Sequence, residues 1–123
     1  MILTQTFFFA GYADKVGVGA GKGTNWNVPL PPGTGQDRYL SAFTLVARLI
    51  EFDPQWLIVS AGFDTYIDDP IGTFRLTTAT FEKIGRRIRA LDTPTLVVQE
   101  GGYWAPDLGR NIVAFLKGLV NLS

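Results

Sequence analysis

The sequence contains no histidine and no cysteine. The missing cysteines exclude disulfides, thiolate nucleophiles and thiolate metal ligands, and they fit a reducing compartment. The missing histidines remove the side chain that most often acts as a general base and as a nitrogen ligand for metals. Any metal site built from these residues alone must therefore use oxygen ligands.

An excess of charge and a long apolar run are also missing. The 11 basic and 11 acidic residues cancel, and no basic cluster marks a nucleic-acid-binding face. No apolar run approaches the length that crosses a bilayer. The first residues have an apolar patch, but they lack the basic region and the small-residue cleavage pattern of a signal peptide. We therefore expect a cytoplasmic protein that binds neither nucleic acid nor a membrane.

The remaining composition is that of one globular domain. The chain has 123 residues, of which 46% are hydrophobic and 13% are aromatic, which is sufficient for a core. This length is typical of a single domain, so we expect residues 1–123 to form one unit.

The apolar pattern predicts alternating strands and helices. β-Prone residues at 2–9 and 25–30 flank a glycine-rich loop at 10–24. A helix is predicted over 36–52, where apolar side chains recur at helical spacing until an Asp-Pro pair ends the run. The continuous apolar run at 56–62 predicts a strand that is buried on both faces, as in a parallel sheet.

The second half of the chain continues this alternation. Thr77 or Thr78 is predicted to be the N-cap of a helix, a second buried strand is predicted within 93–102, and Pro106 suits the first turn of a last helix. The expected apolar faces are Phe81, Ile84, Ile88 and Leu91 in the first helix, and Leu108, Ile112, Phe115 and Leu119 in the last. This order predicts an α/β fold with a mostly parallel sheet flanked by helices.

Two predicted strands are followed by residues that could bind a metal or take part in catalysis. Asp64 follows the strand at 56–62, and Glu100, Gly101, Gly102 and Tyr103 follow the next strand. If the strands are neighbours, a carboxylate and a phenol project from the same edge of the sheet. A carboxylate can bind a metal, and a tyrosine hydroxyl can donate to a developing oxyanion.

These residues also have ordinary interpretations. An aspartate after a strand is more often a cap or a turn former than a ligand, and Tyr103 could be a plain surface or core aromatic. Asp68 and Asp69 are interpreted as a solvated turn. Asp64 with Asp68 or Asp69 could alternatively hold magnesium or calcium. The glycine-rich GVGAGKGT segment fits neither phosphate-loop nor dinucleotide spacing, so it is interpreted as a structural loop.

Four segments together resemble a known family. NVPLPPGTG, SAGFDTYIDDPIG, FRLTT and VVQEGGY occur in this order and resemble the C-terminal part of the histone deacetylase superfamily, especially the bacterial acetylpolyamine amidohydrolases. The resemblance implies part of the three-layer arginase/deacetylase fold, with a mostly parallel sheet flanked by helices. It also implies hydrolysis of acetyl-amides with a zinc ion that two aspartates and one histidine hold.

The resemblance assigns roles to residues at the strand ends. Asp64 corresponds to the second zinc-binding aspartate of the family. Tyr103 corresponds to the catalytic tyrosine that stabilises the oxyanion, and Gly101 and Gly102 correspond to glycines that shape the floor of the substrate pocket.

The resemblance also assigns two aromatic positions earlier in the chain. Phe9, or else Phe8, corresponds to the aromatic wall of the acyl channel. Tyr39 lies near the second monovalent-cation site of the family.

The chain departs from the family pattern in its histidines. The Asp-x-His zinc motif and the histidine pair of the family precede the segments found here. A catalytic zinc normally has three protein ligands, and this chain offers Asp64 alone. The missing general base by itself accounts for about 10²–10⁴-fold in rate. We therefore expect that this chain alone neither binds zinc nor acts as a family-type deacetylase.

Two functions are compatible with this pattern. The first is a truncated, catalytically incomplete relative of the zinc-dependent deacetylases that acts as a structural module or binds a small acetylated or cationic ligand. The alternative is half of a zinc-dependent acetyl-amide hydrolase, which a second chain completes with the Asp-x-His and histidine-pair motifs.

Because a partial sheet leaves edges and apolar faces uncovered, we also expect self-association as a homodimer, with residues 2–9 as a replacement strand or an interface segment.

Overall fold

The strands form two parallel pairs. The computed structural model describes residues 2–5, 11–43 and 46–121. Within these ranges, β1 (Ile2–Gln5) pairs with β2 (Asn27–Leu30), and β3 (Leu57–Gly62) pairs with β4 (Thr95–Glu100). Both pairs are parallel, so the predicted strands and their direction are confirmed where the chain is described.

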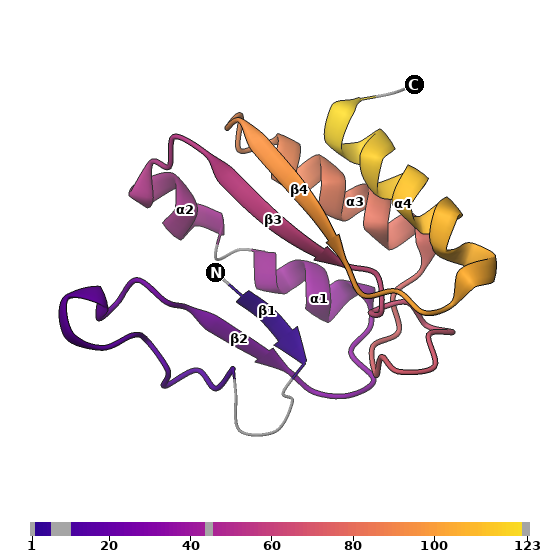
Figure 1. The fold of residues 1–123 in the computed structure, drawn as a ribbon, viewed down its shortest axis with the longest axis horizontal. Coiled ribbons are helices and arrows are strands. Elements are labelled where there is room, and N and C mark those ends of the chain that lie inside the picture. Colours follow the sequence, from indigo (N-terminus) through magenta and orange to yellow (C-terminus); the bar gives the residue numbers. More distant parts are fainter. Residues whose placement is uncertain (1, 6–10, 44–45, 122–123) are drawn as a thin grey trace.

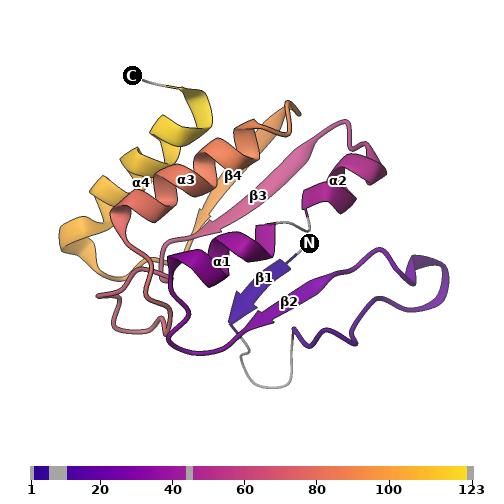
Figure 2. The same ribbon diagram turned by 180° about the vertical axis from the view of Figure 1, so that it is seen from behind.

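The described part of the chain also contains four α-helices and one 3-10 helix. They are α1 (Gln36–Ala42), α2 (Val46–Phe52), α3 (Thr78–Arg89) and α4 (Ala105–Val120), with a short 3-10 helix at Gly19–Gly21 inside the glycine-rich loop. Figures 1 and 2 show α3 and α4 side by side on one face of the β3–β4 pair. The predicted α/β class, with parallel strands and flanking helices, is confirmed. None of the helices in the described part of the chain is long and apolar enough to cross a membrane.

The predicted ends of the last two helices agree with the structure. Thr77 is the N-cap residue of α3, and its backbone N–H donates to Oγ1 of Thr80 over 3.2 Å. Pro106 lies in the first turn of α4. Backbone N–H groups in the first turn have no acceptor within the helix, so proline, which lacks this group, loses no hydrogen bond there.

One prediction about β3 and β4 is wrong. The strands were expected to be buried on both faces, but Ile58, Leu96 and Val98 are 69%, 53% and 42% exposed. Their alternate neighbours, such as Val59 and Val97, pack against the core. The pattern alternates because α3 and α4 cover one face of the pair, while no described element covers the other.

The helix predicted over 36–52 is two helices in the structure. α1 ends at Ala42 and α2 begins at Val46, and residues 44–45 lie outside the described part of the chain. Leu40 and Phe43 are buried as expected, whereas Ile50 is 65% exposed. The apolar face predicted for one helix is therefore buried in α1 but exposed at Ile50 in α2.

Aromatic side chains dominate the core. Phe63, which follows β3, lies 5.2 Å from the ring of Phe81 on α3 and 6.0 Å from that of Phe115 on α4. A second group forms beside α1, where the rings of Phe43 and Phe74 lie 6.0 and 5.9 Å from the ring of Tyr39. The core thus fixes the loop after β3 against both α3 and α4.

Glycine allows α3 and α4 to pack backbone against backbone. A Cβ atom at Gly85 would lie 2.2 Å from the carbonyl oxygen of Phe115, and one at Gly118 would lie 2.1 Å from that of Glu82. Such distances are too short for any side chain, so the approach of these helices requires glycine at both positions.

We predict that Gly85→Ala lowers the free energy of unfolding by about 1–3 kcal/mol, because the helices must separate to admit the methyl group. Gly109→Ala on α4 is the matched control, since no atom lies within 4 Å of a Cβ there. That change should raise stability by up to about 1 kcal/mol through helix propensity. Urea unfolding of both variants measures the difference, and equal effects would contradict the close packing.

Candidate functional site

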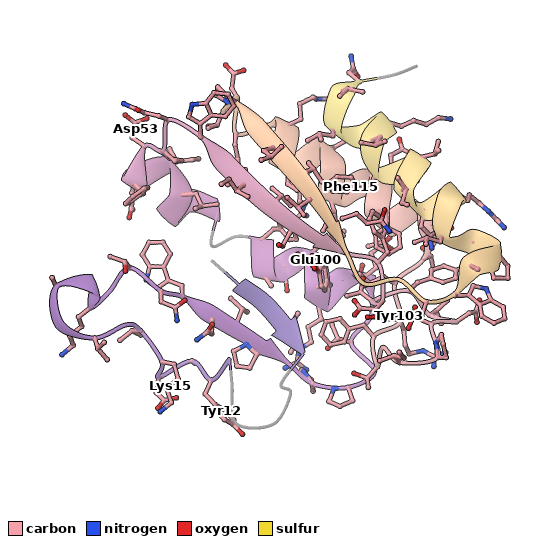
Figure 3. The ribbon with its side chains drawn as sticks, in the orientation of Figure 1. Tyr12, Lys15, Asp53, Glu100, Tyr103 and Phe115 are labelled. Carbon is pink, nitrogen blue, oxygen red and sulfur yellow. The ribbon has the colours of Figure 1, made fainter. Side chains whose placement is uncertain are left out.

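The carboxyl ends of β3 and β4 meet at one edge of their sheet. Gly62 is paired with Glu100, so the loops that follow leave the strands side by side. Figure 3 shows Glu100 and Tyr103 at this end, while Asp53 lies at the opposite end of the strands. The structure therefore brings the loop of Asp64 beside the loop of Tyr103, as the sequence predicts for neighbouring strands.

The glycines after β4 make room for this approach. A Cβ atom at Gly101 would lie 2.7 Å from Oδ2 of Asp64, and one at Gly102 would lie 2.9 Å from Cβ of Phe63. Both glycines also have positive φ, +30° and +105°, where other residues are strained. Gly101 and Gly102 thus let the second loop lie directly against Asp64 and the core.

The loop after β3 folds back on itself. A Cβ atom at Gly72 would lie 1.5 Å from the carbonyl oxygen of Asp64, so residue 72 passes directly over the backbone of residue 64. Tyr66 in the same loop donates from its hydroxyl to Oδ2 of Asp107 on α4 over 3.0 Å. The loop is therefore fixed both internally and to the last helix.

Asp69 differs from its prediction. It was interpreted as part of a solvated turn, but it is 7% exposed. Its Oδ1 accepts from the N–H groups of Ile71 (2.9 Å) and Gly72 (3.0 Å), which is turn geometry. Its Oδ2 accepts from the N–H of Tyr103 over 2.7 Å, across 34 positions of sequence. The Asp-Pro-x-Gly pattern indicates the turn, but no local pattern could have indicated the contact with Tyr103.

The pKa values of Asp69 and Asp64 move in opposite directions. Burial alone would raise the pKa of Asp69, but the N–H groups of Tyr103 and Gly72, with two further backbone donors, outweigh burial and lower it. The pKa of Asp64 is raised, first by partial burial and then by the negative charge of Asp69. Asp64 is thus the carboxylate with unfavourable surroundings for its charge.

Tyr39 belongs to the buried aromatic group beside α1. Burial raises its pKa to about 12, and the negative charge of Asp64 adds to the effect. The cation-site role of Tyr39 stays a prediction. Phe8 and Phe9 lie outside the described residues, so the predicted channel wall is not placed.

The residues at this edge do not fit a catalytic zinc by themselves. In the described ranges, no three histidine, cysteine, aspartate or glutamate side chains lie close enough to hold a metal ion, and the sequence supplies no histidine. Both oxygens of Asp69 accept backbone N–H groups, so they are poor candidates for the alternative site with Asp64. A catalytic zinc site usually has three protein ligands, of which Asp64 could supply one.

Comparison with known proteins agrees with the fold. The sequence profile of the histone deacetylase domain matches residues 3–119. Acetylpolyamine amidohydrolase 1 of Pseudomonas aeruginosa is 43% identical over 112 residues, which are 90% of this chain and 32% of that protein. The acetylpolyamine amidohydrolase of Mycoplana ramosa is 42% identical over 90% of this chain and 33% of its own length. The crystal structure of acetylpolyamine aminohydrolase from Burkholderia pseudomallei matches with a TM-score of 0.86 at 39% identity, over 90% of this chain and 33% of that one.

The chain therefore belongs to the histone deacetylase family, and the family and fold predicted from the sequence are confirmed. It spans about a third of the length of the curated relatives it matches. The roles of Asp64, Gly101, Gly102 and Tyr103 remain predictions, although the structure brings these residues together.

We predict that Asp64→Asn raises the melting temperature by a few degrees at pH 7. Because the folded pKa of Asp64 is raised, its contribution to stability is complete below the unfolded pKa and is lost as the pH rises through the folded value. The gain from the neutral side chain should therefore vanish below about pH 4, where aspartate is protonated.

Thermal unfolding at several pH values tests this expectation. Asp68→Asn is the matched control, because Asp68 is exposed in the same loop and its substitution should leave the melting temperature unchanged. A loss of stability in Asp64→Asn at pH 7 would contradict the electrostatic interpretation.

Proposed function

We propose that these 123 residues supply the Asp64–Tyr103 edge of a zinc-dependent acetyl-amide hydrolase site and are catalytically incomplete as they stand. The observation that carries this proposal is the meeting of Asp64 with the Gly101–Gly102–Tyr103 segment in a sequence without histidine. Asp64 offers a metal ligand and Tyr103 offers a hydroxyl to a developing oxyanion, but the general base and the other ligands are missing.

On its own, the chain would act as a binding or structural module of the family. The relatives named as acetylpolyamine amidohydrolases suggest a cationic, acetylated amine as the ligand class. Tyr103, with 56% of its side chain exposed, is accessible for such a contact.

We predict that the purified chain with equimolar zinc releases no acetate from acetylputrescine or from an acetyl-lysine peptide, and that dialysed protein retains no stoichiometric zinc. The reason is that one carboxylate cannot replace three ligands and a base. Acetate release and bound metal are measured directly, with a full-length acetylpolyamine amidohydrolase as the positive control. Zinc-dependent hydrolysis that disappears in Asp64→Asn would overturn the claim of incompleteness.

We also propose, as a second candidate, that another polypeptide completes this half-site. The observation in its favour is the uncovered face of the β3–β4 pair, which carries Ile58, Leu96 and Val98. Purely parallel sheets are almost always covered on both faces, because their strands are apolar on both. The rest of a deacetylase domain, which makes up about two thirds of the relatives, is the cover that this proposal assigns to the face.

A chain studied without that cover should bury the face against a second copy of itself. We predict a concentration-dependent homodimer by light scattering, which Leu96→Lys with Val98→Lys weakens by at least about tenfold, since each buried aliphatic side chain contributes roughly 1.5–3 kcal/mol. Val113→Lys is the control, because Val113 is 52% exposed on α4, away from this face. A monomer at all concentrations, or equal effects of both changes, would exclude association through β3 and β4.

A further inference from the structure

Asp69 carries a buried charge whose contacts exceed the needs of a turn. The N–H groups of Ile71 and Gly72 satisfy Oδ1 within the loop, as in many aspartate turns. Oδ2 accepts the N–H of Tyr103 at 2.7 Å, the shortest of these three hydrogen bonds. A residue that only formed the turn would not need this third donor.

Two glycines precede Tyr103 in the chain. Gly101 and Gly102 permit conformations that other residues avoid, and both have positive φ here. Tyr103 is 56% exposed, so packing restrains it less than a buried residue. The hydrogen bond from the Tyr103 N–H to Asp69 therefore restrains the backbone directly after two residues that permit many conformations.

The charge of Asp69 makes this bond strong. Hydrogen bonds to an ionised carboxylate are about twice as strong as neutral ones. The lowered pKa of Asp69 keeps the group ionised at neutral pH, and its causes include the N–H groups of both Tyr103 and Trp104. Within the described residues, none of the ion pairs involves Asp69, so backbone dipoles stabilise its charge.

We propose that Asp69 is the positioning residue of Tyr103: its carboxylate joins the loop after β3 to the main chain at Tyr103 and so fixes where the phenol leaves the sheet edge. The importance of that position rests on the proposed function, in which Tyr103 donates to an oxyanion. The bond itself does not depend on turnover. In this proposal the two aspartates of the loop after β3 have different roles. Asp64 offers a metal ligand, and Asp69 holds the loop after β4 in place through the Tyr103 N–H.

Amide hydrogen exchange of the full chain, labelled with ¹⁵N only at tyrosine, tests the proposal. The sequence has four tyrosines, so the spectrum has four backbone amide signals, and Tyr103→Phe identifies the signal of interest. In the unmutated chain, the Tyr103 amide should be protected. Asp69→Ser keeps an oxygen for the local turn but cannot span to Tyr103, so it should raise the Tyr103 exchange rate by at least about tenfold, the equivalent of one charge-assisted hydrogen bond.

Two other tyrosine amides report on the rest of the fold. The N–H of Tyr39 bonds to the carbonyl of Gly35 in α1, and that of Tyr66 bonds to the carbonyl of Phe63 in the Asp69 loop. Both should keep their protection in Asp69→Ser. Asp68→Asn is the matched control and should change none of the four signals. Asp69→Asn, which removes the charge but retains the shape, should give a smaller increase for Tyr103.

Three results would overturn the proposal. The first is exchange of the Tyr103 amide at the free-peptide rate in the unmutated chain. The second is an unchanged Tyr103 rate in a folded Asp69→Ser. The third is an equal loss of protection at Tyr39, Tyr66 and Tyr103 in both Asp69→Ser and Asp69→Asn, which would make Asp69 a general fold residue. Because no readout involves acetate release or zinc, failure here is distinct from failure of the proposed function.

Discussion

The parallel register of β3 and β4 is the constraint on which the rest of this structure depends. Pairing Gly62 with Glu100 sets both carboxyl ends at the same height, so that the two following loops must share one small volume. Glycines at 101 and 102 are the result, because the carboxylate of Asp64 and the side chains of Phe63 and Leu108 occupy the space that a side chain would need there. Within the loop after β3, the carbonyl group of Asp64 takes up the same space at Gly72. The site geometry is therefore a consequence of the sheet, and the loops add the functional groups.

The two aspartates of the loop after β3 show how neighbours in sequence acquire different chemistry. Asp69 is the more buried, yet its pKa is lowered, because burial is outweighed by the backbone donors aimed at it. Asp64 is less buried, yet its pKa is raised, because its partial burial is not offset by enough donors and the negative charge of Asp69 adds to the effect. A carboxylate whose charged form is disfavoured by its surroundings is typical of functional sites, which often lower the stability of the fold.

Local patterns predicted most of the elements. The structure confirms the N-cap at Thr77, the place of Pro106 in the first turn of α4, the strands at 56–62 and within 93–102, and most of the apolar faces of α3 and α4, all of which follow from spacing and propensity. The exposure of Ile58 could not be predicted, because an apolar run does not reveal whether a covering element is present. The role of Asp69 could not be predicted either, since its partner Tyr103 lies 34 residues away and only the tertiary fold joins them.

The order of β3, α3, β4 and α4 along the chain has a consequence for how the protein folds. These elements occupy residues 57–120 without interruption by β1 or β2, and the closest helix contacts join α3 to the next helix in sequence. The β3–β4 pairing and the α3–α4 contacts lie wholly within this stretch, so they can form without β1 or β2. We expect this stretch to behave as a cooperative unit that forms first and protects its amides longest, with the β1–β2 pair docking afterwards. The edge with Asp64 and Tyr103 would then be assembled early, before the glycine-rich loop is in place.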